Sequence, residues 1–183
     1  MKIRTFLALE LSQTVRKKLS ADVEMLSRYE NLQQVRWVPE DKYHLTLAFL
    51  GYVEYVLISS LKLELEQILS YNRVVPFRFK EITPFPFSGN PKIVAAILEQ
   101  LDELMKLHHI TAKCFRAFGI SLERRRFTPH VTLGRLKFRS RKFLTFQPQQ
   151  IFLEGVSEKV VFLGSDLTSK GAVYKSLGEI SLM

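Results

Sequence analysis

A tetrapeptide of the form His-x-Thr-Leu occurs twice in this chain, each time in a β-forming run. The copies are His44-Leu45-Thr46-Leu47 and His130-Val131-Thr132-Leu133. Side chains alternate between the faces of a strand, so the histidine and threonine of each copy share a face. Two such pairs would supply two imidazoles that exchange protons near neutral pH and two hydroxyl donors for an anion. The repeat therefore predicts a fold that pairs two β-strands around a site suited to metal-free phosphodiester chemistry.

Apolar spacing predicts strands and helices that mix without a steady βαβ repeat. Strands are expected over residues 3–10, 34–38, 43–50, 74–79, 92–98 and 126–135, followed by closing strands over 150–156, 160–168 and 173–182. Three amphipathic helices are expected, the first N-capped by Ser12. Their apolar stripes are Val15, Leu19, Val23 and Leu26; Leu57, Leu61, Leu65 and Ile68; and Leu101, Met105, His108, Ala112 and Phe115 within residues 99–118.

Turn and stop signals divide these elements. We expect Gly51 to end the first histidine strand, Asn72 to end the second helix and Gly119 to end the third. Residues 83–91 are the richest turn signal, and we interpret them as a lobe connection or a substrate-side loop. The order helix, strand, histidine strand recurs in both halves, which suggests an internal duplication with two lobes.

Charge and composition restrict the partners. The chain has 183 residues, of which 46% are hydrophobic, enough for one domain or for two small lobes that share a core. Its 27 Lys and Arg against 18 Asp and Glu give a net charge of +9, which favours an anionic partner such as nucleic acid. Ordinary solubility charge is the alternative interpretation. A basic turn is expected at Arg139, Arg141 and Lys142.

The single cysteine, Cys114, excludes an internal disulfide and a multi-cysteine zinc site. We expect a reducing, cytoplasmic location, because the sequence shows neither a signal peptide nor an apolar run near the roughly 20 residues that a membrane helix needs. A Gly-rich phosphate loop with a following Lys, His-Glu-x-x-His and Gly-x-Ser-x-Gly are also absent, which weakens the NTPase, zincin and serine hydrolase hypotheses.

Other candidate residues have two interpretations each. Arg126 shares the face of His130 if strand alternation extends back through Thr128, and it is then a phosphate contact; otherwise it is a surface residue. Arg135 falls on the opposite face by the same argument, as a structural or rim residue. Trp37 and Phe6 are packing residues or parts of a substrate cleft. His108 and His109 are interpreted as structural.

The chain resembles the 2H phosphoesterases, and within them the RNA 2′,3′-cyclic phosphodiesterases that were once called 2′-5′ RNA ligases. The resemblance covers almost the full chain. It rests on Arg4-Thr5-Phe6-Leu7-Ala8-Leu9, Arg36-Trp37-Val38-Pro39, the run from His44 to Gly51, the run from Arg126 to Arg135, and Gly171 with Tyr174. It implies one bilobal α+β domain over residues 1–183, with two antiparallel sheets facing each other across a cleft and helices outside.

The implied reaction is hydrolysis of a 2′,3′-cyclic phosphate at an RNA end to a 2′-phosphate, with neither metal nor cofactor. His44 is implied as the proton donor to the leaving 3′ oxygen and His130 as the base, with Thr46 and Thr132 holding phosphate oxygens. The chain departs from the pattern at Lys92 to Ala96, where many relatives carry an arginine and an aromatic residue. That departure leaves base stacking and substrate preference open.

Three alternatives remain at this stage. The same chemistry could act on a nucleotide cyclic phosphate, or run in reverse as 2′-5′ ligation of tRNA halves. The chain could also be a noncatalytic RNA-binding module. Two retained histidines favour an enzyme, because binding an anion does not require two neutral imidazoles. We expect a monomer whose partner is RNA with a cyclic phosphate end, with tRNA fragments among the candidates.

Overall fold

An antiparallel sheet organises the computed structural model, which describes residues 1–70, 74–87, 90–136, 146–168 and 171–182. The strands are β1 (Lys2–Glu10), β2 (Val35–Trp37), β3 (His44–Glu54), β4 (Val75–Phe85), β5 (Ile93–Leu98), β6 (His130–Leu136), β7 (Gln149–Gln150), β8 (Glu154–Ser157), β9 (Lys159–Thr168) and β10 (Gly171–Ser181). The helices are α1 (Gln13–Ser27), α2 (Tyr55–Leu69) and α3 (Asp102–Ala117), with 3-10 turns η1 (Glu30–Leu32) and η2 (Glu40–Lys42).

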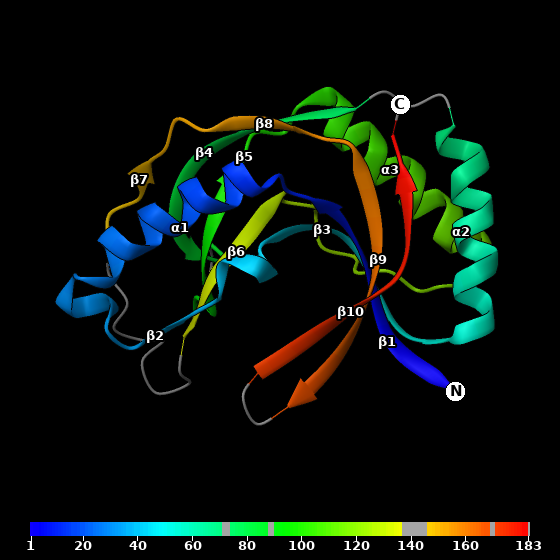
Figure 1. Cartoon of the computed structure of the whole chain (residues 1–183), viewed down its shortest axis with the longest axis horizontal. Coiled ribbons are helices and arrows are strands. Elements are labelled where there is room, and N and C mark those ends of the chain that lie inside the picture. Colours follow the sequence, from blue (N-terminus) through cyan, green and yellow to red (C-terminus); the bar gives the residue numbers. More distant parts are fainter. Residues whose placement is uncertain (71–73, 88–89, 137–145, 169–170, 183) are drawn as a thin grey trace.

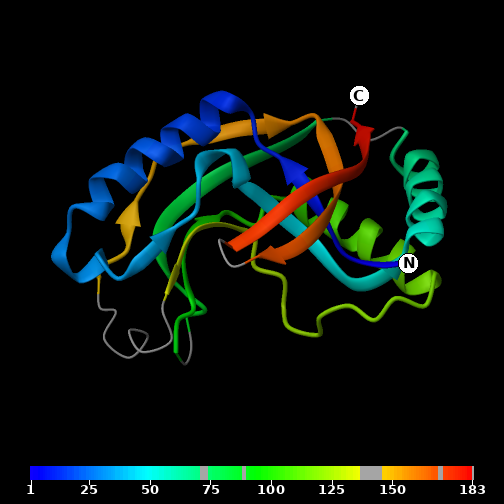
Figure 2. The same cartoon turned by 60° about the horizontal axis from the view of Figure 1, so that its bottom comes forward.

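The strands follow the order β10-β9-β1-β3-β6-β5-β4-β7, with β2 paired to β6 and β8 paired to β4. Every pairing is antiparallel, so the predicted α+β class is confirmed. The two predicted sheets are the two halves of this sheet, which meet where Leu45 of β3 pairs with Val131 of β6. Figures 1 and 2 show the long arc of β4 in one half and the β9–β10 hairpin in the other.

The strand order is symmetric about the junction of β3 and β6. On one side β1 pairs with β3 and α1 connects them; on the other β5 pairs with β6 and α3 connects them. Each histidine motif therefore begins the inner strand of a strand-helix-strand unit. This arrangement agrees with the predicted internal duplication.

Helix α1 begins and packs as predicted. The Ser12 hydroxyl accepts a hydrogen bond from the Val15 N–H at 3.3 Å, and the predicted stripe of α1 is buried. The start of the helix lies against β8, where a Cβ on Gly155 would be 3.1 Å from Val15 Cγ2 (Figure 1). The predicted stripe of the first helix is thus part of the core.

Helices α2 and α3 bury their predicted stripes only in part: Leu61 and Leu65 of α2 and Ala112 and Phe115 of α3 are buried as predicted. In α2 the buried residues are Ile58, Leu61, Leu65 and Leu69. In α3 they are Leu104, Leu107, Thr111, Ala112, Cys114 and Phe115. Each of these helices is apolar on more than one row, and α3 packs against β3, β4 and α2 together, so the contacts rather than the spacing select the buried rows. Helix α3 begins at Asp102 because Leu101 is extended (φ −65°, ψ 143°), and it ends before Gly119 as predicted.

Several predicted boundaries were wrong, and the strand expected over 150–156 is divided into β7 and β8. Gly51 does not end β3; it lies inside the strand at φ 74°, a left-handed conformation that favours glycine, next to a register shift against β1. Residues 83–85 belong to β4 rather than to a loop. The predicted signals at Asn72, Ser88 and Gly89 and the basic turn at Arg139, Arg141 and Lys142 lie outside the described residues.

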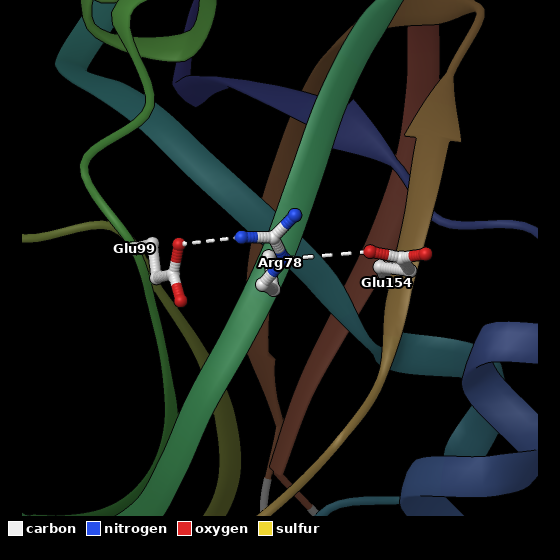
Figure 3. Close-up of polar contacts among 3 residues, drawn as sticks. All are labelled: Arg78, Glu99 and Glu154. Atoms are coloured by element: carbon white, nitrogen blue, oxygen red, sulfur yellow. Dashed lines mark hydrogen bonds and ion pairs between the residues drawn. The ribbon is translucent and has the colours of Figure 1, made fainter.

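An exposed ion-pair network links β8 and the end of β5 through β4. Arg78 of β4 bonds Glu99 at 3.3 Å and Glu154 of β8 at 3.4 Å, and Figure 3 shows the guanidinium lying between the two carboxylates. Exposed pairs of this kind contribute about 0–1 kcal/mol each, so the network adds little to the stability of the fold. Of the helices in the described part of the chain, none combines the length and hydrophobicity that a membrane crossing requires.

Candidate active site

The two His-x-Thr motifs lie side by side on one face of the sheet. Leu45 and Val131, which pair across β3 and β6, are fully buried on the opposite face. Directly paired residues share a face, so the flanking residues of both strands point together to the other side. These residues are His44, Thr46, His130 and Thr132, and all four are partly exposed. Continuing the antiparallel register sets His44 opposite Thr132 and Thr46 opposite His130.

Both motifs contain a β-bulge at their fourth residue. Leu47 is the extra residue between the pairs Leu7–Ala48 and Ala8–Thr46, and Leu133 is the extra residue between Val94–Gly134 and Ala95–Thr132. After the bulge, the next residue turns to the core and the sixth turns back to the histidine face. Residues 44–49 and 130–135 therefore share one burial pattern, in which the sixth residues, Phe49 and Arg135, are exposed.

The bulge corrects the interpretation of Arg135. Unbroken alternation would send this arginine to the face opposite His130, but the extra residue Leu133 returns it to the histidine face. Its charge acts on His44, where it lowers the pKa of the imidazole. Arg135 is thus an electrostatic neighbour of the site.

Both imidazoles are held in the same tautomer. His44 Nδ1 donates to the Lys42 carbonyl at 2.7 Å, and His130 Nδ1 donates to the Thr128 carbonyl at 2.8 Å. A carbonyl only accepts hydrogen bonds, so in each neutral ring the proton is on Nδ1 and Nε2 carries the lone pair. Within the described residues neither Nε2 has a hydrogen-bond partner. Both are available to a ligand.

The two threonine hydroxyls are also available. Among the described residues, neither Thr46 Oγ1 nor Thr132 Oγ1 makes a hydrogen bond, whereas buried Thr5 and Thr111 bond backbone carbonyls. Partly buried hydroxyls without protein partners are suited to donate to an anion placed between the histidines.

Aromatic rings enclose the histidines. Phe6 and Tyr174 lie 5.0 and 5.2 Å from His44 between ring centroids, and Phe85 lies 4.6 Å from His130. The sequence assigned no role to Tyr174, which belonged only to the family-like tail, and it placed Phe85 in a loop. Phe85 stands at the end of β4, and its ring contacts that of His130 in β6 across the intervening strand β5.

Burial in this environment lowers the pKa of both imidazoles. The pKa of His44 falls to about 4, chiefly because burial disfavours its charged form, and the charges of Arg135 and His130 lower it further against the opposing Lys42 hydrogen bond. Burial also lowers the pKa of His130, and its bond to Thr128 opposes the shift. Both rings are therefore neutral near pH 7 in the free protein.

Arg126 lies outside the strand. It precedes β6, so strand alternation does not orient it, and its Nη2 donates to Gln100 Oε1 at 3.1 Å. Together with Thr128 and exposed Phe87 it lines an open pocket of about 450 Å³. The Thr128 carbonyl that holds His130 connects this pocket to the histidine site.

Of the remaining candidates, Trp37 and Phe6 pack in or against the core, whereas His109 does not. Trp37 lies against the core and over Gly134, where a Cβ would be 2.9 Å from Trp37 Cε3. Phe6 is buried yet touches His44 with its ring. His109 is exposed on α3. In the part of the chain that the structure describes, no three His, Cys, Asp or Glu side chains gather as a metal site would need.

Comparison with known proteins places these features in context. The family model "LigT like Phosphoesterase" matches residues 9–95. An RNA 2′,3′-cyclic phosphodiesterase of Thermotoga maritima is 30% identical, covering 97% of this chain and 94% of that protein. An RNA 2′,3′-cyclic phosphodiesterase of Archaeoglobus fulgidus is 26% identical, covering 96% of this chain and 98% of that protein.

Solved structures show the same fold. The crystal structure of TT0787 of Thermus thermophilus has a TM-score of 0.79 and 27% identity, with 98% of each chain covered. That of E. coli LigT complexed with 3′-AMP has a TM-score of 0.81 and 21% identity, covering 100% of this chain and 99% of that one.

Proposed function

Because the chain belongs to the LigT-like phosphoesterase family, we propose that it hydrolyses the 2′,3′-cyclic phosphate at the end of an RNA to a 2′-phosphate. Relatives that match nearly its full length are named for this activity. The observation that carries the proposal is the pairing of two imidazoles whose Nε2 atoms lack protein partners with two hydroxyls that also lack them among the described residues, all on one face. That set supplies an acid, a base and two anion donors.

In the proposed reaction water attacks the phosphorus and the bond to the 3′ oxygen breaks. His130 Nε2 takes the proton of the attacking water, and His44 in its protonated form gives a proton to the leaving 3′ oxygen. The hydroxyls of Thr46 and Thr132 donate to the non-bridging oxygens, where negative charge increases in the transition state. After the reaction His130 carries the extra proton and His44 is neutral. A proton transfer between the two histidines, or exchange with solvent, restores their starting protonation states.

The direct test is hydrolysis of a short RNA that ends in a 2′,3′-cyclic phosphate, with EDTA present. We expect turnover to a 2′-phosphate end, identified by chromatography against 2′- and 3′-phosphate standards. A chain that binds this RNA and converts none of it would be the noncatalytic binding module. Turnover only of mononucleoside cyclic phosphates would identify a nucleotide enzyme instead.

The histidine pKa values predict an acidic pH optimum for the free enzyme. Reaction needs one protonated and one neutral imidazole, so kcat/KM should be bell-shaped, with limbs set by the pair. Both pKa values are lowered, that of His44 to about 4, so the maximum should lie below about pH 6.5, the ordinary imidazole pKa. The negative charge of bound substrate favours the protonated imidazoles, so the kcat profile should lie at higher pH than the kcat/KM profile.

Arg135→Gln checks the cause of that shift. Removing this cation should raise the pKa of His44 and move the acidic limb of kcat/KM to higher pH. Arg36→Gln changes another exposed arginine, the strand partner of Arg135, and has no such contribution to the pKa of His44. Equal profiles for the unmodified chain and Arg135→Gln would contradict the electrostatic assignment.

Arg126 is proposed as a contact to the RNA strand rather than to the reacting phosphate, because it lies in the pocket beyond Thr128. Arg126→Ala should raise KM for a short RNA about fivefold, the value of an exposed charge contact of about 1 kcal/mol, while KM for a mononucleoside 2′,3′-cyclic phosphate stays unchanged. Arg125→Ala is the matched control, since Arg125 pairs with Glu123 at 2.8 Å. An equal rise in KM for both substrates would mean that Arg126 contacts the reacting cyclic phosphate.

The proposal also keeps one bilobal domain over residues 1–183, a monomer, and a cytoplasmic location. A single cluster of buried residues drawn from both halves of the sheet supports the single domain. The sole cysteine, buried Cys114, suits a reducing compartment. Size-exclusion chromatography with light scattering tests the monomer.

A further inference from the structure

The two bulges leave two backbone carbonyls that need donors. At a bulge the ladder is interrupted, so the carbonyl of the extra residue must find another partner. In the second motif the Leu133 carbonyl accepts from the Val38 backbone N–H at 2.8 Å. In the first motif the Leu47 carbonyl accepts from the side chain of His108, Nδ1 to O at 3.0 Å. The donor to the bulge carbonyl is thus a side-chain imidazole of α3 in the first motif and a main-chain amide in the second.

His108 is held rigidly for this contact. Its ring stacks on Phe127 with centroids 3.9 Å apart and planes 9° apart. Burial lowers its pKa, so the ring is neutral near pH 7, and the Leu47 carbonyl fixes the proton on Nδ1. Phe127 immediately precedes Thr128, whose carbonyl orients His130. One ring therefore contacts the first motif by a hydrogen bond and the segment just before the second motif by stacking.

We propose that His108 is a positioning residue for the reaction: it fixes the bulge that aims Thr46 and supports the segment that orients His130. The inference rests on the proposed function for its kinetic consequence, although the contacts themselves do not. His108 touches neither of the reacting groups, so it acts only through the alignment of Thr46 and His130.

Three variants separate the two contacts. His108→Phe keeps an aromatic ring against Phe127 and removes the donor to Leu47. We expect kcat to fall about tenfold through misalignment of Thr46, less than the roughly hundredfold that a 1 Å misplacement can cost, with KM little changed. His108→Gln offers an amide donor without the ring and should recover part of that loss. Phe127→Leu removes the stack and should lower kcat while the Leu47 contact remains. His109→Phe, at the exposed neighbouring position, should behave as the unmodified chain.

The readouts distinguish positioning from simple stability. A lower kcat at unchanged KM, in a variant that circular dichroism shows to be folded at the assay temperature, supports the proposal. A variant His108→Phe that melts earlier but keeps the kcat of the unmodified chain overturns it, as does a His108→Gln variant no better than His108→Phe.

The inference also has a test that needs no turnover. In ¹⁵N-labelled protein without substrate, the amide resonances of Thr46 and His130 should shift in His108→Phe and stay in place in His109→Phe. If the unmodified chain hydrolyses nothing but these shifts appear, the proposed function fails and the positioning role stands. If neither resonance moves, the positioning role fails.

Discussion

Replacing His44 or His130 with alanine should lower kcat at least about a hundredfold, the low end of what one acid or base contributes. Each imidazole is oriented by its own backbone carbonyl and directs Nε2 to the shared face, so no other described histidine can replace it. Because acid and base act in one step, the double variant should be little worse than the poorer single variant. Hydrolysis of a short RNA with a 2′,3′-cyclic phosphate end, followed at saturating substrate, measures the effect.

His109→Ala is the matched control, since it removes an exposed histidine from α3 and should leave kcat unchanged. His44→Gln and His130→Gln retain side-chain volume beside Phe6, Tyr174 and Phe85, so a loss of activity in them is not explained by a cavity. Undiminished turnover in either alanine variant would exclude the two-histidine mechanism. Retained RNA binding in an inactive variant would show that the imidazoles are needed for chemistry and not for the complex.

Replacing Thr46 or Thr132 with valine should lower kcat by about ten- to a hundredfold. Valine has the shape of threonine without the hydroxyl, so the strand packing remains while one donor to the phosphate oxygens is lost. A single preorganised donor to a developing charge is worth about a hundredfold or more. We expect somewhat less here because the second threonine still donates. Thermal melts of the same samples establish that the variants are folded.

Thr46→Ser and Thr132→Ser keep the hydroxyl and should retain most of the rate, with a modest loss because serine rotates more freely than a β-branched residue in a strand. The comparison of Val with Ser at each position isolates the hydrogen bond. Equal kcat in the Val and Ser variants would mean that the hydroxyls do not contact the reacting phosphate.

Much of this fold could be predicted from the sequence because its strands are apolar runs separated by clear turn and helix signals. Residues 3–10, the α1 stripe from Val15 to Leu26 and Gly119 at the end of α3 follow local rules that tertiary contacts do not override. The pairing of the two histidine motifs was expected from their repetition. The family resemblance supplied the roles of acid and base, because the spacing of residues does not distinguish one from the other.

The bulges could not be predicted by alternation alone. Leu47-Ala48 and Leu133-Gly134 look like ordinary core residues of a strand, yet each pair breaks the two-residue period after its threonine. The signal was present as two adjacent apolar residues at the same place in both motifs. Without this signal, unbroken alternation placed Arg135 on the wrong face of the sheet. Tyr174 and Phe85 lie far from the histidines in sequence, so only the folded sheet brings them to the site.

The matched bulges also show where the two motifs differ in charge. As backbone, the motifs are interchangeable: each has the same burial pattern and the same carbonyl behind its histidine. They diverge at the sixth position, where one carries the neutral ring of Phe49 and the other the cation of Arg135. Burial is the main cause that lowers the pKa of His44, and the charge of Arg135 adds to it, which favours release of a proton from His44. In the proposed reaction this charge favours His44 as the proton donor, so two halves with matching backbones differ electrostatically around their histidines.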